Sequence, residues 1–186
     1  MDPPNPRSAP EVFWYFVTHD GPAPWEVEGR RQIAFDDVKA LAAAIDRLPY
    51  EGALLATTGH NVWVLGAAAA AITRNFKPLL AIRPQFISVT ELANMVVSFN
   101  NLFDNRLLIN VINSETPIWR QNGIWLENEQ RFELHAEYWD VFQQLVKKLP
   151  GKVSIFISNR RLLTRGCHRA RRCRYGFPAL PGRRWR

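Results

Sequence analysis

Short apolar runs alternate with longer segments of helical periodicity along most of the chain, and this alternation restricts the possible folds most strongly. Four runs are predicted to be strands, at residues 12–18, 52–57, 79–83 and 106–112. Their apolar residues stand at consecutive positions, which is typical of strands that are covered on both faces. Because a helical segment follows each run, the sequence predicts an α/β fold of about four β-α units around a parallel sheet.

The segments between the strands carry the start signals of helices. Asp36 is a good N-cap for the first helix, and a second helix is expected over residues 62–75. Ser88 and Glu91 have capping-box spacing at the start of the third helix, and residues 113–127 are expected to form a long loop. The residues expected to face the core are Val38, Leu41, Ala42, Ile45 and Leu48 in the first helix, Leu92, Met95, Phe99 and Leu102 or Phe103 in the third, and Phe132, His135, Trp139, Phe142, Val146 and Leu149 in the last.

Two arrangements of such units are possible, namely an open doubly wound sheet and part of a (β/α)8 barrel. The junction after the first strand, residues 18–35, contains no G-x-G-x-x-G, and G-x-x-x-x-G-K-[ST] occurs nowhere in the chain. Because both nucleotide-binding fingerprints are missing, a partial (β/α)8 TIM barrel is favoured over the doubly wound sheet, which stays open. The irregular Arg-rich carboxyl-terminal tail is expected to lie outside these units.

One uncharged segment has the length of a membrane span, because residues 52–72 comprise 21 positions without a formal charge. Its centre, residues 57–61, is polar and turn-like, so a strand, a loop and a helix are expected there and no membrane partner. The first residues lack the basic start and apolar run of a signal peptide, which predicts a cytoplasmic protein.

The positive charge of the chain is concentrated near its end. The chain has 24 Lys and Arg residues against 17 Asp and Glu, and ten of the arginines lie in residues 159–186, where no acidic residue occurs. Residues 1–158 therefore hold 14 basic against 17 acidic side chains. A basic isoelectric point suggests a nucleic acid or an anionic membrane as partner, but that inference applies only to residues 159–186.

Polar side chains follow the predicted strands at their carboxyl ends, where parallel α/β folds place their chemistry. The residues at these strand ends are His19, Asp20, Gly59, His60, Asn61, Arg83, Pro84, Asn113, Ser114 and Glu115. Together they predict a pocket, in which His60 and Asn61 are the candidate substrate-binding residues. There is no G-x-S-x-G motif, and Cys167 and Cys173 both lie in the basic segment. The histidines and acids lack metal-ligand spacing, so no metal site is expected.

Four stretches that contain these features occur in the order of a known family. They are VFWYFVTHDG, ALAAAIDRLPYEGALLAT, LLAIRPQFISVTELANMVVSFNNLFDNRLLINVINSETP and NGIWLENEQRFELHAEYWDVFQQL. The ordered set resembles the flavin-dependent two-component monooxygenases of the bacterial luciferase-like superfamily, specifically the alkanesulfonate monooxygenase group. The resemblance implies a (β/α)8 barrel that uses reduced FMN, supplied by a separate flavin reductase, and O2 to oxygenate a small organic substrate such as an alkanesulfonate.

The resemblance also implies roles for individual residues. His19 matches the histidine that faces flavin and substrate after the first strand, and is the catalytic candidate. Asn110 matches an asparagine near the isoalloxazine, and Arg83 begins a pair that matches the family's RP at the end of the third strand. Both are therefore cofactor-binding candidates.

The family's H-x-E-R-Y motif appears here as residues 128–132, which adds Asn128 and Arg131 to the cofactor-binding candidates. Asn128 and Phe132 stand where the family has histidine and tyrosine. The loop after the second strand is shorter than in the alkanesulfonate enzymes and lacks their active-site cysteine.

The chain is expected to divide into a disordered lead (residues 1–11), the amino-terminal half of a barrel (12–152) and an aberrant basic tail (153–186). A complete barrel needs about 250 residues. The tail changes abruptly to Arg, Cys, Pro and Trp without periodicity, as an out-of-frame reading of a GC-rich gene does. A frameshift and an inactive, truncated enzyme are therefore expected.

Two other interpretations stay open. The Arg-rich tail could make the chain a nucleic-acid-binding module, although a peptide of this charge also binds polyanions non-specifically. Alternatively, the open half-barrel could pair with a second copy or another polypeptide through its exposed strand edges.

Overall fold

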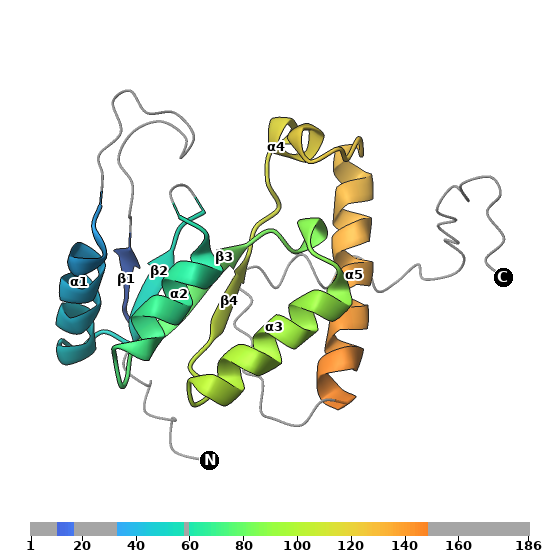
Figure 1. The fold of residues 1–186 in the computed structure, drawn as a ribbon. Coiled ribbons are helices and arrows are strands. Elements are labelled where there is room, and N and C mark those ends of the chain that lie inside the picture. Colours follow the sequence, from blue (N-terminus) through green and yellow to red (C-terminus); the bar gives the residue numbers. More distant parts are fainter. Residues whose placement is uncertain (1–10, 17–32, 58–59, 149–186) are drawn as a thin grey trace, which may run out of the picture.

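The computed structural model describes residues 11–16, 33–57 and 60–148 (Figure 1). The elements are β1 (Phe13–Phe16), α1 (Phe35–Arg47), β2 (Gly52–Leu55), α2 (Val62–Ala71), β3 (Lys77–Ile82), η1 (Pro84–Phe86), α3 (Val89–Leu102), β4 (Leu108–Val111), α4 (Thr116–Gln121) and α5 (Asn128–Lys148). The four strands form one parallel sheet in the order β1-β2-β3-β4. The predicted α/β fold with four parallel strands is confirmed.

The strand register divides the sheet into two faces. One row across the sheet pairs Phe16 with Leu55, Leu55 with Leu80, and Leu80 with Ile109, and all four residues belong to the hydrophobic core. Helices α2 and α3 lie across this face (Figure 1). Because side chains alternate along a strand, Asn110 lies on the opposite face, beside Ala81.

The helix boundaries correct one predicted cap and confirm another. Helix α1 begins at Phe35, before Asp36, and the carboxylate of Asp37 accepts the Ala34 amide at 2.9 Å. The prediction of Asp36 as N-cap is therefore wrong. The N-cap position is Ala34, and the carboxylate that binds its amide comes from Asp37, inside the first turn of the helix. The predicted cap of α3 is confirmed, since the Ser88 hydroxyl accepts the Glu91 amide at 3.2 Å.

Most of the predicted core positions are buried, and the exceptions lie near helix ends. Leu48 follows the last residue of α1 and is 53% exposed, and Leu102 at the end of α3 is 74% exposed, whereas the alternative Phe103 packs against the core. Phe132 is 41% exposed. Leu149 lies outside the described residues.

The long loop predicted for residues 113–127 contains a helix that sequence reasoning missed. Helix α4 has Pro117 in its first turn and buries Trp119. Proline fits there because its missing amide proton would have no helical partner. The pair Thr116 and Pro117 was therefore the signal in the sequence that could have revealed α4.

The uncharged segment 52–72 is folded into β2 and α2. Within the described part of the chain, no helix combines the length and the apolarity that crossing a bilayer requires. The predicted basic tail and, apart from exposed Glu11, the predicted lead lie outside the described residues, so the proposed domain division stays a prediction.

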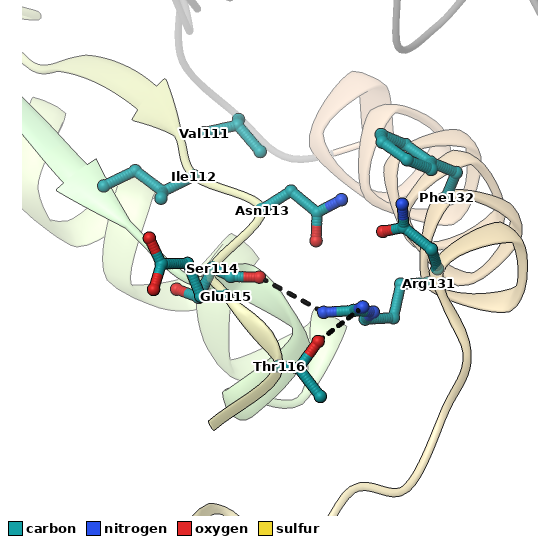
Figure 2. A pocket seen from close by; sticks show the side chains of 9 residues that line it. Val111, Ile112, Asn113, Ser114, Glu115, Thr116, Arg131 and Phe132 are labelled. Atoms are coloured by element: carbon teal, nitrogen blue, oxygen red, sulfur yellow. Dashed lines mark hydrogen bonds between the residues drawn. The ribbon is translucent and has the colours of Figure 1, made fainter. Parts of the chain in front are cut away.

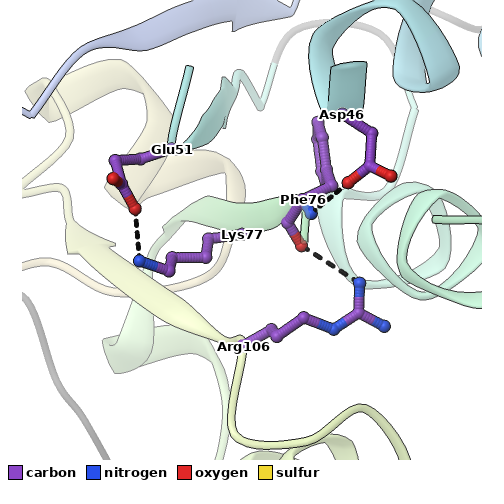
Figure 3. A network of polar contacts seen from close by, with 5 residues as sticks. All are labelled: Asp46, Glu51, Phe76, Lys77 and Arg106. Atoms are coloured by element: carbon purple, nitrogen blue, oxygen red, sulfur yellow. Dashed lines mark hydrogen bonds and ion pairs between the residues drawn. The ribbon is translucent and has the colours of Figure 1, made fainter. Parts of the chain in front are cut away.

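A polar network fixes the loops at the amino-terminal ends of the strands (Figure 3). The Asp46 carboxylate accepts the backbone amides of Arg74, Asn75 and Phe76 at 3.1, 2.7 and 2.6 Å. The Arg106 guanidinium donates to backbone carbonyls on the same loop, including that of Phe76 at 3.3 Å. Burial alone would raise the pKa of Asp46, but the three amides and the charge of Arg106 hold it below its ordinary value of 3.8.

Substitution of Asp46 by alanine should destabilise the protein by about 2–4 kcal/mol, because charge-assisted hydrogen bonds to backbone amides are lost together. A carboxylate whose pKa is lower in the folded state stabilises the protein above its unfolded pKa, so this contribution should fade as the pH falls below about 4. Urea unfolding of both proteins at pH 7 and pH 3 measures the difference.

The matched control is Asp36→Ala, because the Asp36 side chain is 85% exposed and pairs only with Lys39 one turn away. Exposed pairs of this kind contribute little to stability. Equal effects of the two substitutions at pH 7 would contradict the structural role given to Asp46.

Candidate ligand cleft at the carboxyl end of β4

A cleft of about 770 Å³ opens between the loop after β4 and the first turn of α5 (Figure 2). Its lining residues are Val111, Ile112, Asn113, Ser114, Glu115, Thr116, Asn128, Arg131 and Phe132. The cleft lies at the carboxyl end of the sheet, where parallel α/β folds bind their ligands. Its volume falls within the range of small-molecule sites, about 300–1,000 Å³.

Trp119 of α4 fixes the loop that forms one wall of the cleft. Its indole nitrogen donates to the Ser114 carbonyl at 2.9 Å. Its ring packs against Phe86 and His135, with centroid separations of 5.6 and 5.7 Å. Because Trp119 is 1% exposed, the loop backbone is held by a residue that is itself fixed in the core.

Arg131 reaches the same loop from α5, as Figure 2 shows. Its Nη1 donates to the Ser114 carbonyl at 3.4 Å and its Nη2 to the Thr116 hydroxyl at 3.0 Å. The guanidinium stacks on Trp119, 5.6 Å from the ring centroid, and the residue is 6% exposed. Its Nε is buried without a hydrogen-bond partner, as is the side-chain oxygen of Asn113. Two buried polar atoms at the cleft are thus left unsatisfied.

Arg83 connects three neighbouring strand ends. Its Nε donates to the Ser114 hydroxyl after β4 at 2.6 Å, and its Nη2 donates to the Thr57 hydroxyl after β2 at 2.9 Å. Burial lowers the pKa of Arg83 from its ordinary value. Ser114 therefore accepts one hydrogen bond from Arg83 with its hydroxyl and one from Arg131 with its carbonyl.

Below the cleft, His135 of α5 joins η1 through a hydrogen bond of 2.8 Å between its Nε2 and the Gln85 side-chain oxygen. Burial lowers the pKa of His135 to about 4, so the imidazole is neutral at pH 7. Tyr138, one turn further along, donates to the Ile87 carbonyl at 3.0 Å. These contacts place α5 against η1 and so fix the position of Arg131.

The cleft includes only some of the residues proposed from the sequence. Asn128 and Arg131 line it, and Arg83 contacts its wall through Ser114. Asn110 lies on β4, half-buried, on the face opposite the helix-packed core. His19 lies outside the described residues, so its role stays a prediction.

The two substrate-binding candidates do not line the cleft. The side-chain oxygen of Asn61 accepts the amides of Trp63 and Val64 at 3.0 and 3.4 Å and caps α2. His60 is exposed on the same connection. Sequence reasoning missed Thr116, Trp119 and Gln85. Their roles at the cleft are hydrogen bonds to Arg131, to the Ser114 carbonyl and to His135, and these bonds form only once the chain has folded.

Comparison with protein families gives a match to the model for luciferase-like monooxygenases over residues 12–180. The matched range continues beyond the last described residue into the predicted tail, and the proposed frameshift stays a prediction.

Comparison with solved structures gives partial matches to complete barrels. Long-chain alkane monooxygenase LadA aligns with a TM-score of 0.54 and 18% identity over 58% of this chain and 31% of its own. EDTA monooxygenase EmoA from a Chelativorans species aligns with a TM-score of 0.55 and 18% identity over 70% and 36%. Riboflavin lyase RcaE, solved with modified FMN and riboflavin, aligns with a TM-score of 0.55 and 16% identity over 75% and 37%. The chain thus spans about a third of the length of these structures.

Proposed function

Because the chain belongs to the luciferase-like monooxygenase family, we propose that the cleft beside β4 is its part of a binding site for reduced FMN. The unsatisfied pair of buried polar atoms in the cleft supports this proposal most directly. Buried polar groups are rarely left without partners in folded proteins. A ligand with both hydrogen-bond donors and acceptors on its rim, as an isoalloxazine has, fits the acceptor on Asn113 and the donor on Arg131.

The other lining residues also suit a flavin. Asn128 offers a side-chain amide, and the exposed ring of Phe132 offers an apolar surface against which a planar ligand can pack. Asn110, on the sheet face opposite the helix-packed core, is also proposed to contact the flavin ring. When bound, reduced flavin would supply the electrons with which O2 is activated.

In this proposal the residues of the chain bind and orient. Arg131 and Trp119 hold the Ser114 carbonyl and so set the shape of the loop facing the ligand. Neutral His135 holds α5 against η1 through Gln85 without adding a second charge. His19 is proposed as the catalytic residue by resemblance, and His60 and Asn61 as substrate contacts from their place after the second strand.

The reaction proposed for the complete barrel is oxygenation of a small organic substrate by O2, with flavin reductase as partner. An alkanesulfonate is the substrate class that the sequence resemblance favours. The half-barrel is also proposed to self-associate, and the basic segment to bind nucleic acid only non-specifically, through charge.

Restoring the family motif tests the flavin proposal. The double substitution Asn128→His with Phe132→Tyr adds a ring nitrogen and a hydroxyl at two lining positions, and should tighten binding of reduced FMN by about tenfold to a hundredfold. Anaerobic fluorescence titration measures the dissociation constants.

The control is Phe35→Tyr, which adds the same hydroxyl at the exposed start of α1, away from the cleft. An equal gain in the control, or no gain in the double variant, would show that flavin does not bind in this cleft.

A further inference from the structure

Arg83 carries a positive charge that forms no ion pair with an acidic side chain among the described residues. Its two hydrogen bonds to described residues go to the neutral hydroxyls of Thr57 and Ser114. Both ion pairs among the described residues lie elsewhere, at Lys39 with Asp36 and at Lys77 with Glu51. A partly buried guanidinium without a carboxylate is costly, because desolvation is not repaid by a counter-charge.

The unused donors around Arg83 converge from three strand ends. A guanidinium has five N–H donors, and the Nη1 of Arg83 has no hydrogen bond to the described residues and is not among their fully buried atoms. A ligand can therefore reach it without movement of the neighbouring side chains. The hydroxyls of Thr57 and Ser114 accept from Arg83, so each keeps its own proton to donate.

A second guanidinium strengthens the positive potential at this place. Arg131 donates to the carbonyl of the same Ser114 and forms no ion pair with a carboxylate in the part of the chain that the structure describes. The nearest acid in the loop, Glu115, is exposed and extends away from Arg131 in Figure 2. Both cations thus favour an anion near Ser114.

We propose that Arg83, Thr57 and Ser114 form a subsite for the oxyanion group of the substrate, a sulfonate or carboxylate. The proposal rests on the function proposed above, because it assigns the substrate end of the same ligand region. The guanidinium and two hydroxyls supply donors from three directions, which suits a group with two or three equivalent oxygens. An apolar or cationic substrate would leave the partly buried Arg83 without a counter-charge.

Titration of the full 186-residue chain with methanesulfonate, without flavin and at constant ionic strength, tests the subsite. Saturation-transfer NMR on the methyl group should show saturable binding, and neutral dimethyl sulfone should bind at least about tenfold more weakly, because it cannot form a charge-assisted bond. Equal binding of the two compounds by the unaltered chain would overturn the proposal, whatever any variant does.

Variants then locate the site. Arg83→Gln should weaken methanesulfonate binding by about tenfold or more, and Thr57→Val by a few-fold. Arg74→Gln removes an exposed arginine at the opposite end of the sheet and should change nothing. Equal losses in the Arg74 and Arg83 variants, or no loss in the Arg83 variant, would overturn the proposal.

Titrations with FMN and with riboflavin show whether Arg83 binds the substrate or the phosphate group of the flavin. We expect Arg83→Gln to leave the ratio of FMN to riboflavin affinity unchanged. If FMN alone weakens, Arg83 binds the flavin phosphate and the substrate assignment is wrong. If methanesulfonate binds and neither flavin does, the flavin proposal fails and the anion subsite stands.

Discussion

Replacing Gly52 with alanine should prevent the chain from folding stably. A Cβ atom at this position would lie 1.9 Å from the carbonyl oxygen of Lys77 and 2.6 Å from its carbonyl carbon. Both are backbone atoms of the neighbouring strand, in register with Gly52, and cannot turn aside as a side chain does. The strands would have to separate at the start of β2, so we expect a loss of about 4 kcal/mol or more from a total of about 5–15 kcal/mol.

Gly66→Ala is the matched control. There the added Cβ meets a methyl group of Leu80 at 2.7 Å, which is the far end of a flexible side chain. Alanine also favours the helical conformation of α2 by about 1 kcal/mol, which offsets part of the crowding. Circular dichroism during thermal and urea unfolding compares the variants, and similar midpoints for both would show that β2 and β3 are not packed as described.

The fold can be predicted from the sequence where residues close together in the chain are enough to determine the structure they form. The consecutive apolar residues of β3 fill the sheet on both faces, and the Ser88 cap depends on residues three positions apart. Helix α4 was missed because six residues are too few for a periodic signal. Leu48 matches the helical period but comes after the end of α1 and stays exposed.

The site could be predicted only where a residue's position along the chain fixes its role. Asn128 and Arg131 were proposed from a motif at a helix start, and both line the cleft. Asn61 was proposed from its place after β2, but the first residue before a helix also serves as its cap. Trp119 could not be proposed as the support of Ser114, because that contact depends on how α4 folds back on its own loop.

The purified 186-residue chain should bind reduced FMN no better than about millimolar and should release no sulfite from alkanesulfonates when a flavin reductase is supplied. Eight strand ends surround the ligand of a complete barrel, and phosphate sites in such barrels commonly follow the seventh and eighth strands. The described sheet has four strands. Asn128 and Phe132 further replace two polar partners that the resemblance places near the flavin.

Each missing charge-assisted hydrogen bond is worth about 1.5–3 kcal/mol, so the loss of two or three weakens binding by roughly a thousandfold or more. Anaerobic fluorescence titration followed by a sulfite-release assay measures affinity and turnover separately. Weak binding that improves in the restored-motif variant would agree with a cleft that retains only part of the flavin site. Micromolar binding with turnover that His19→Ala abolishes would instead establish that this chain alone holds a working flavin site and would contradict the expected loss of affinity.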